Sequence, residues 1–538
     1  MIGADAIIKC LEEEGVKYVF GYPGVAICPF YNSILQSEIQ TILIRTEQNA
    51  AHAASGMARI TGKPGVCAVT SGPGATNVIT GIATAFADSI PLVCITGQVH
   101  TDLLGSDSFQ EADITGAVES FVKYSYLVKN VGDIPRIFKE AFHIANTGRR
   151  GPVLIDIPID IQNAPISRFQ YPEEVNMRTY KPTVKGHAVQ IKKVIKELEK
   201  AKRPIICVGG GVLLSQAREE LRGFVEKYRI PVVSTMMGIG VMPTEHPLYF
   251  GMVGNHGKAY ANRAMNESDL LIMAGARVAD RAVSQPDLIT KNKVLVHIDV
   301  DPAEIGKNAG PTIPLVGDVK HIFQDFAKEE FTCEHEEWIR TLSEYRENLV
   351  VKRNPNPAYV DPAAFITRLS EKMAPDGVYV ADVGQNQIWS CSYHIVKEGR
   401  FLTSGGMGTM GYSIPAAMGA KLADKSRQVI AVCGDGSFQM SMMELATMRQ
   451  YSVPVKIIVL KNGYLGMVRE YQHYTYKDNY SVVDLSGSPM LDKIAAAYDM
   501  QYQLLENMDR AEEVLDAFLK EDTSVLLECL IDPMDLVK

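Results

Sequence analysis

Short apolar runs recur along the whole chain, each followed by a glycine or polar turn and then by a longer helical pattern. The clearest of these runs cover residues 66–70, 92–96, 153–157, 205–208, 270–274, 294–299, 429–433 and 455–460. Uninterrupted Val, Ile and Leu are typical of strands that are buried on both faces, as in parallel sheets covered by helices. The pattern therefore predicts an α/β protein whose ligands bind beyond the carboxyl ends of its strands.

Two irregular stretches interrupt this alternation. Residues 164–183 contain three prolines, and residues 353–362 read RNPNPAYVDP. Segments of this kind, without helical or strand periodicity, mark boundaries between domains. We therefore predict three doubly wound parallel-sheet domains, which cover residues 1–165, 184–350 and 360–538.

Composition and charge exclude several function classes. The chain has 538 residues, with 54 Lys and Arg against 63 Asp and Glu, and its net charge of −9 argues against nucleic acid as a partner. The start of the chain lacks the pattern of a signal peptide, and its apolar runs are too short for a membrane span. Nine cysteines without a C-x-x-C pair fit reduced thiols in the cytoplasm.

Asp435 and Asn462 follow two successive predicted strands of the third domain. Because a strand, helix and parallel strand return the chain to the same sheet edge, we expect the two side chains to converge. A carboxylate and an amide oxygen suit a Mg²⁺ ion that also binds a diphosphate, and the flanking Gly434 and Gly436 let the backbone approach the phosphates. A Gly-Asp-Gly turn by itself equally fits a plain structural turn, and Asn462 favours the metal interpretation.

Residues 44–62 predict a helix of small residues with Glu47 in its first turn. Taken alone, this carboxylate is explained as a favourable charge at a helix N-terminus. A functional role for Glu47 is favoured once it is considered together with other segments. These are the turns at 21–24 and 71–77, which read GYPG and SGPGATN, and the pair of Asp435 and Asn462.

Together these segments resemble the thiamine diphosphate enzymes, and within them the catalytic large subunits of acetohydroxyacid synthase (acetolactate synthase). The likeness runs along nearly the whole chain and includes the segments 105–113 and 405–411, which read GSDSFQEAD and GGMGTMG. It implies a pyrimidine-binding first domain, a central domain of the FAD-binding type, and a third domain that binds the diphosphate and Mg²⁺.

The resemblance implies four residues with catalytic roles, namely Glu47, Phe109, Gln110 and Tyr471. In the family, the glutamate at the position of Glu47 hydrogen-bonds the aminopyrimidine ring of the cofactor, and general acid–base help of this kind is worth roughly 10² to 10⁴ in rate. The family also places this glutamate on one subunit and the metal ligands on the other. A single copy of the chain would then be inactive.

A larger set of residues is implied for thiamine diphosphate. It comprises Tyr22, Pro23, Gly24, Glu47, Thr70, Pro73, Asn77, Val383, Gly384, Gln385, Asn386, Gly408, Met410, Gly434, Asp435, Gly436, Ser437, Asn462, Tyr464, Gly466 and Met467. The metal ligands among them are the side chains of Asp435 and Asn462 and the backbone carbonyl of Tyr464.

Two of the positions that the resemblance implies, one for the cofactor and one for catalysis, depart from the family pattern. Asn386 stands where the family usually has His, and the missing ring nitrogen predicts weaker cofactor binding. Tyr471 stands where the family has Trp, which forms one wall for the second 2-oxo acid. Because Tyr has less apolar area and a polar tip, we expect a weaker preference for 2-oxobutyrate over pyruvate.

FAD is the second cofactor that the resemblance implies. The positions that would hold it are Arg149, Gly209, Gly210, Gly211, His256, Gly275, Arg277, Arg281, Asp299 and Asp318. Three glycines in a row are a weak dinucleotide signal, and residues 277–281 read RVADR where the family has RFDDR. A turn-rich structural domain is the alternative.

The implied activity is that of a transferase of branched-chain amino-acid biosynthesis, which decarboxylates pyruvate and joins the remainder to pyruvate or 2-oxobutyrate. One alternative is another thiamine diphosphate enzyme on pyruvate, either a flavin-dependent oxidase or a carboligase with a different acceptor. A second is a catalytically silent paralogue that acts as a binding subunit, although Glu47, Asp435 and Asn462 argue against it. The resemblance implies small 2-oxo acids as substrates, a homodimer or homotetramer with active sites at the subunit interface, and a small regulatory subunit as a further partner.

Overall fold

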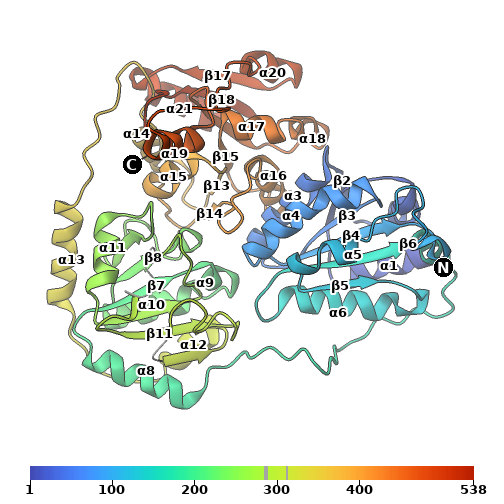
Figure 1. Ribbon diagram of the computed structural model, residues 1–538, viewed down its shortest axis with the longest axis horizontal. Helices are drawn as coiled ribbons and strands as arrows, with labels where there is room; N and C mark the ends of the chain where they lie inside the picture. Colours follow the sequence, from blue (N-terminus) through green and yellow to red (C-terminus); the bar gives the residue numbers. More distant parts are fainter. Residues whose placement is uncertain (284–288, 311–312, 538) are drawn as a thin grey trace.

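The computed structural model describes residues 1–283, 289–310 and 313–537, and it contains three six-stranded sheets (Figure 1). Every registered strand pair is parallel, which confirms the prediction of three α/β units with parallel sheets. All eight apolar runs predicted as strands lie within or overlap strands of the structure. The predicted helix of small residues is α3 (Glu47–Thr61), which ends at Gly62 in a left-handed conformation with φ of +70°.

The first and third sheets have the same strand order. In space the first runs β2 (Gln40–Leu43), β1 (Tyr18–Tyr22), β3 (Gly65–Val69), β4 (Leu92–Gln98), β6 (Pro152–Pro158) and β5 (Tyr124–Leu127). The third runs β14 (Arg400–Leu402), β13 (Val378–Ala381), β15 (Val429–Gly434), β16 (Lys456–Lys461), β18 (Val525–Leu530) and β17 (Gln501–Leu505). These two domains are therefore built on one topology.

The middle sheet is connected differently. It runs β12 (Ile313–Val316), β11 (Val294–Asp299), β10 (Leu270–Ala274), β7 (Pro204–Val208), β8 (Val232–Ser234) and β9 (Tyr249–Met252). The connection reverses between β10 and β7, and this is the order of doubly wound sheets that bind dinucleotides at the reversal point.

Helices cover both faces of each sheet (Figure 1). Those of the first domain are α1 (Gly3–Glu13), α2 (Cys28–Ser33), α3, α4 (Pro73–Ala87), α5 (Ile114–Ala117), α6 (Ile134–Asn146) and α7 (Ile159–Asn163). The middle domain has α8 (Ala188–Lys200), α9 (Gly210–Leu214), α10 (Arg218–Tyr228), α11 (Ala259–Glu267), α12 (Val319–Phe326) and α13 (Glu336–Asn348). The third has α14 (Pro362–Lys372), α15 (Gln385–Tyr393), α16 (Ser413–Ala423), α17 (Asp435–Ser441), α18 (Glu444–Gln450), α19 (Gly466–Tyr476), α20 (Leu491–Ala497) and α21 (Ala511–Lys520).

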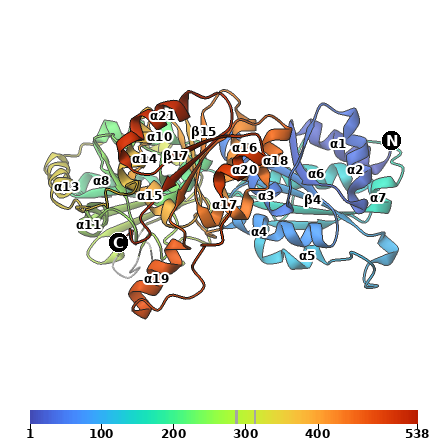
Figure 2. The same cartoon turned by 90° about the horizontal axis from the view of Figure 1, so that it is seen from above.

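The first and third domains pack against each other through α3 and α16. A Cβ on Gly56 would lie 2.0 Å from the carbonyl oxygen of Ala416, and one on Gly419 would lie 1.8 Å from that of Ala53. Glycine at both crossings lets the two helix backbones approach closely. One hydrophobic core consequently extends through both domains. Helix α19, by contrast, projects from the body of the third domain (Figure 2).

Candidate active site

Asp435 and Asn462 lie together at one edge of the third sheet, as their positions in the sequence predict. They follow the neighbouring parallel strands β15 and β16, and both line a small cavity of about 80 Å³. Oδ2 of Asp435 accepts a hydrogen bond from the Gly463 backbone N–H at 2.8 Å, and Oδ1 of Asn462 accepts one from that of Tyr464 at 3.0 Å. Burial raises the pKa of Asp435 to about 6, against the opposing effect of backbone N–H groups.

Most residues expected around the diphosphate line this smaller cavity. They are Val383, Gly384, Gln385, Asn386, Met410, Gly434, Asp435, Gly436, Ser437, Asn462, Tyr464, Gly466 and Met467. The sequence interpretation missed Trp389, Leu460, Leu465 and Val468, which also line it. These are apolar side chains, and no pattern in the sequence separates them from ordinary core residues.

The side-chain amide nitrogen of Asn386 hydrogen-bonds to the protein backbone. Its Nδ2 donates to the carbonyl oxygens of Asp382 at 2.8 Å and Val432 at 3.2 Å. Its Oδ1 lies beside Gly384, where a Cβ would come within 3.0 Å of that oxygen. Because Asn has no further N–H on its side chain, this residue supports the strand ends rather than offering a donor to the cavity.

Asp382 is a further residue of this edge that sequence reasoning missed. It follows β13 directly and is fully buried. Its Oδ1 accepts from the Gly411 backbone N–H at 2.9 Å and its Oδ2 from that of Ser413 at 2.8 Å, so it holds the segment that carries Met410. Burial raises the pKa of this carboxyl group. Its place as the first polar residue after an apolar strand is a signal that would have found it.

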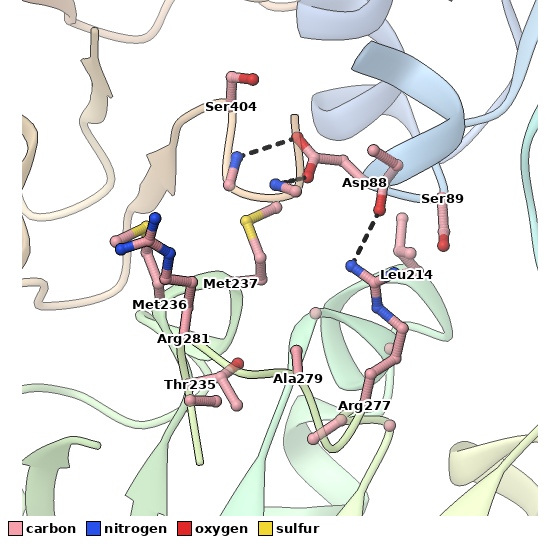
Figure 3. A pocket seen from close by; sticks show the side chains of 18 of the residues that line it. Asp88, Ser89, Leu214, Thr235, Met236, Met237, Arg277, Ala279, Arg281 and Ser404 are labelled. Atoms are coloured by element: carbon pink, nitrogen blue, oxygen red, sulfur yellow. Dashed lines mark hydrogen bonds between the residues drawn. The ribbon is translucent and has the colours of Figure 1, made fainter. Parts of the chain in front are cut away.

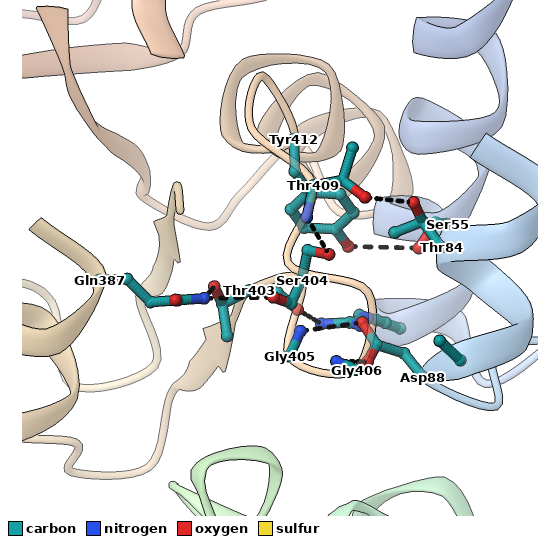
Figure 4. Close-up of polar contacts among 12 residues, drawn as sticks. Ser55, Thr84, Asp88, Gln387, Thr403, Ser404, Gly405, Gly406, Thr409 and Tyr412 are labelled. Atoms are coloured by element: carbon teal, nitrogen blue, oxygen red, sulfur yellow. Dashed lines mark hydrogen bonds and ion pairs between the residues drawn. The ribbon is translucent and has the colours of Figure 1, made fainter. Parts of the chain in front are cut away.

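The first domain of the same chain also holds this segment (Figure 4). Asp88, which follows α4, accepts hydrogen bonds from the backbone N–H groups of Gly405 at 3.2 Å and Gly406 at 2.6 Å. Arg59 donates to Asp88 and to the carbonyl oxygen of Thr403, each at 2.7 Å. A single carboxylate after a helix gives no sequence signal of this role.

Glu47 lies in the first domain, where it begins α3. Its Oε2 accepts a hydrogen bond from Nδ2 of Asn77 at 3.1 Å. Gly74 lies next to it, since a Cβ there would be 3.4 Å from Oε1 of Glu47 and 2.8 Å from Cγ2 of Thr70. Gly24 packs on the same threonine. Tyr22 and Pro23 precede Gly24, and Pro73 precedes Gly74, so the structure brings the expected first-domain residues to one sheet edge.

Phe109 and Gln110 lie on the loop that follows β4. The side chain of Phe109 is 87% exposed, and Gln110 adopts a left-handed φ of +59°. Gln110 packs on Gly72, since a Cβ added to Gly72 would lie 2.9 Å from the Cβ of Gln110. Tyr471 lies on α19 of the third domain and is 60% exposed. One chain therefore presents two groups of candidate residues, one on its first domain and one on its third.

A larger cavity of about 550 Å³ lies where the three domains meet (Figure 3). Nine expected flavin positions line it, namely Arg149, Gly210, Gly211, His256, Gly275, Arg277, Arg281, Asp299 and Asp318. Gly209 instead packs on the neighbouring turn, since a Cβ there would lie 2.2 Å from the carbonyl oxygen of Gly275. Gly408 lines this cavity too, and Val383, Gly384 and Met467 line both cavities.

Charged side chains surround the larger cavity. Arg149 Nη1 lies 2.8 Å from a carboxylate oxygen of Glu304. Arg277 donates to the carbonyl oxygen of Ala87 at 3.2 Å and points towards the end of α4, on the other side of Ala279 from Arg281 (Figure 3). Burial raises the pKa of Asp299 to about 6.

The described residues contain neither a metal-binding cluster of His, Cys, Asp and Glu side chains nor a membrane-spanning helix. Among residues 1–283, 289–310 and 313–537, no three His, Cys, Asp or Glu side chains are grouped as a metal site would require. Within the same ranges, no helix is long and apolar enough to cross a membrane.

Comparison with known proteins gives matches in all three domains. Three domain models of the thiamine pyrophosphate (thiamine diphosphate) enzymes match: the N-terminal TPP binding domain over residues 1–117, the central domain over 191–326, and the C-terminal TPP binding domain over 382–529. The chain is 43% identical to a probable acetolactate synthase large subunit of Methanocaldococcus jannaschii, and the match covers 99% of this chain and 93% of that one. It is 41% identical to the acetolactate synthase large subunit of Lactococcus lactis, with coverage of 99% and 93%. For the same subunit of Corynebacterium glutamicum the identity is 42%, with coverage of 99% and 87%.

Proposed function

Because the chain belongs to the acetolactate synthase family of thiamine pyrophosphate enzymes, we propose that it removes CO₂ from pyruvate and joins the two-carbon remainder to a second 2-oxo acid. With pyruvate as acceptor the product is 2-acetolactate, and with 2-oxobutyrate it is 2-aceto-2-hydroxybutyrate. Either product feeds branched-chain amino-acid biosynthesis. The smaller cavity supports this proposal most strongly, because Asp435, Asn462 and the turn of Gly434 and Gly436 meet there at one sheet edge.

The oxygen donors at this edge fit Mg²⁺ bound to a diphosphate. One carboxylate, one amide oxygen and the carbonyl of Tyr464 form a hard donor set of low charge, which leaves room for phosphate oxygens. We propose that Asp435, Asn462 and Tyr464 hold the metal, and that the other residues lining the smaller cavity hold the diphosphate.

Thiamine diphosphate, when bound, supplies the electron sink that lets pyruvate lose CO₂. The protein must position the reactants and handle protons. We assign to Glu47 the holding and moving of a proton at the aminopyrimidine ring, with Asn77 orienting its carboxylate through the 3.1 Å hydrogen bond. Gly24, Thr70 and Gly74 pack around it and would shape the pocket of the ring.

Two copies of the chain would complete each active site. Glu47 and its hydrogen-bond partner Asn77 belong to the first domain, whereas the lining of the smaller cavity lies between Val383 and Val468. We propose that the first domain of one copy faces the third domain of another, so that the working unit is at least a homodimer. The exposed Phe109 and its neighbour Gln110 would then approach the reacting groups of the partner, and Tyr471 would form a wall for the acceptor.

FAD fits the larger cavity. Its volume of about 550 Å³ is in the range of ligand pockets, and it opens beyond the strand ends of a sheet with the dinucleotide-binding order. Arg277, Arg281 and His256 provide donors along its wall, and Gly210 and Gly211 leave room at the end of β7. We propose that these residues hold FAD, and that Gly209 contributes by packing on Gly275.

The three domains of this proposal cover residues 1–165, 184–350 and 360–538, ranges that each contain one sheet. Relatives named as large subunits support a small regulatory subunit as a further partner. Nine free cysteines, most of them buried, support a reducing compartment such as the cytoplasm.

The test is product analysis by NMR after incubation of the purified chain with pyruvate, thiamine diphosphate and Mg²⁺, with FAD and 2-oxobutyrate each added or omitted. We expect 2-acetolactate, and its loss in the Glu47→Gln variant. Acetate formed with reduction of oxygen or a quinone would show a pyruvate oxidase instead. Full cofactor binding without any product would show a silent binding subunit.

A further inference from the structure

Helix α19 buries a carboxylate at its base. The helix projects from the third domain (Figure 2), yet the side chain of Glu470 in its second turn is turned into the protein, and the residue is 4% exposed. Its Oε2 accepts hydrogen bonds from Nε2 of Gln385 at 2.9 Å and from the backbone N–H of Val537 at 3.0 Å. Because burying an unpaired carboxylate is costly, these donors are what permit Glu470 at this position.

The neighbours of Gln385 determine which way its side-chain amide is oriented, because the NH₂ group must face acceptors and the oxygen must face a donor. Its Nε2 faces two groups that accept, the carboxylate of Glu470 and the carbonyl oxygen of Asp535 at 3.2 Å. Its Oε1 therefore points the other way, where it accepts from Nδ2 of Asn462 at 3.0 Å. With Nδ2 engaged there, Oδ1 of Asn462 lies on the opposite side, at the N–H of Tyr464.

Gly466 leaves the room that this arrangement needs. A Cβ on Gly466 would lie 2.0 Å from Oε1 of Gln385 and 2.8 Å from Nδ2 of Asn462. Gly466 and Glu470 are four residues apart, so they lie on the same face of α19. This face thus provides both the space for the pair of amides and the acceptor that orients it.

We propose that Glu470 is a positioning residue of the metal site. By accepting from Gln385 it orients that amide, which in turn keeps the oxygen of Asn462, and not its NH₂ group, available to the cation. Hydrogen-bond partners behind the ligands of a metal commonly tune its affinity in this way. The inference rests on the metal site proposed above, and it gives Gln385 a role through Asn462.

The test measures binding of Mn²⁺, as a probe for Mg²⁺, to the full-length protein with thiamine diphosphate present, by the EPR signal of free Mn²⁺. We expect Glu470→Met to weaken binding about 10- to 100-fold, the usual effect of removing such a partner. Glu470→Gln should stay within about threefold of the wild type, because its amide oxygen can accept the same two hydrogen bonds. Glu513→Met on α21, an exposed carboxylate, is the matched control and should change nothing.

An Asn462→Asp background separates orientation from mere structural support. There both side-chain atoms are oxygen, so the direction of the side chain no longer matters, and adding Glu470→Met should weaken Mn²⁺ binding by less than about threefold. An equal loss in both backgrounds would overturn the inference, as would wild-type affinity in Glu470→Met. If Glu470→Met does not fold, equal binding by Gly466→Ala and the wild type would overturn it. Failure of the wild type itself to bind Mn²⁺ would instead overturn the proposed metal site.

Discussion

Arg59 on α3 and Asp88 at the end of α4 form a buried ion pair, with Nη2 and Oδ2 2.7 Å apart and side chains that are 5% and 1% exposed. The pair belongs to the first domain, yet both residues also bind the backbone of the third domain at Thr403, Gly405 and Gly406 (Figure 4). The segment that follows carries Met410 into the smaller cavity. The packing of the two domains within one chain therefore positions part of the cofactor site.

Removing this carboxylate should destabilise the protein strongly. Asp88→Ala leaves Arg59 buried without its partner, and breaking one half of a buried pair costs about 3–5 kcal/mol. Urea denaturation followed by circular dichroism measures the loss. Glu513→Ala, which breaks the exposed pair with Arg510, is the control and should leave the midpoint unchanged. An Asp88→Ala midpoint equal to that of the wild type would contradict the role assigned to the pair.

The glycines between α3 and α16 should not tolerate a methyl group. Gly56→Ala places a Cβ 2.0 Å from the Ala416 carbonyl oxygen, so the helices must separate, at a cost of about 1–3 kcal/mol. Gly223→Ala on α10 is the matched control, because nothing lies within 4 Å of its Cβ and alanine favours helix there. Thermal unfolding should show a lower midpoint for the first variant and an unchanged or higher one for the second. The reverse order would exclude this packing.

Asp156 should make stability depend on pH. Burial between β6 and β4 raises the pKa of Asp156 to about 7, against hydrogen bonds from Thr96 and Gln98. A carboxyl group whose pKa is raised in the folded state binds a proton that the unfolded chain has released. Its contribution is therefore fully present below about pH 4 and is lost as pH rises through about 7. We expect Asp156→Asn to flatten the fall in the free energy of unfolding between about pH 4 and pH 7, measured by urea titration, and an unchanged slope would argue against this assignment.

Tyr471 should control the choice of acceptor. Tyr471→Trp adds apolar area to the proposed acceptor wall, and recognition of one methylene is worth about 1–3 kcal/mol. We expect the product ratio of 2-aceto-2-hydroxybutyrate to 2-acetolactate to rise by about fivefold or more in competition between 2-oxobutyrate and pyruvate. Tyr474→Trp, on the same helix and also exposed, is the control. Equal ratios in the wild type and Tyr471→Trp would remove Tyr471 from the acceptor site.

The buried centre of the fold could be predicted from the sequence, and its edges could not. Strands such as β3, β4 and β15 are mainly apolar, because helices cover both of their faces, and this pattern is visible in one sequence. Edge strands such as β5 and β14 are short, and β5 is also partly exposed, so the sequence does not separate them from loops. The convergence of Asp435 and Asn462 could be predicted because both follow apolar strands joined by a helical segment.

The partners that orient the site were not predictable in the same way. Asp88 acts on Gly405 and Gly406, and Glu470 on Gln385, across long separations in the chain. Periodicity reports which face of an element is buried, but it does not report which distant backbone group that face meets. Glu470 is an exception to the usual pattern, in which the buried face of a surface helix is apolar. It is a charged residue, yet it is the one that α19 buries.

If Glu47 of one copy works with Asp435 and Asn462 of another, two variants that are each inactive should complement one another. Glu47→Gln and Asp435→Asn each disable one of the two halves of the site. Co-expressed in equal amounts under separate affinity tags, they form mixed dimers in which one of two sites is intact, so acetolactate formation should return to about a quarter of the wild-type level. If both halves belonged to the same copy, the mixture would stay as inactive as each variant alone, and that result would exclude an active site shared between two copies.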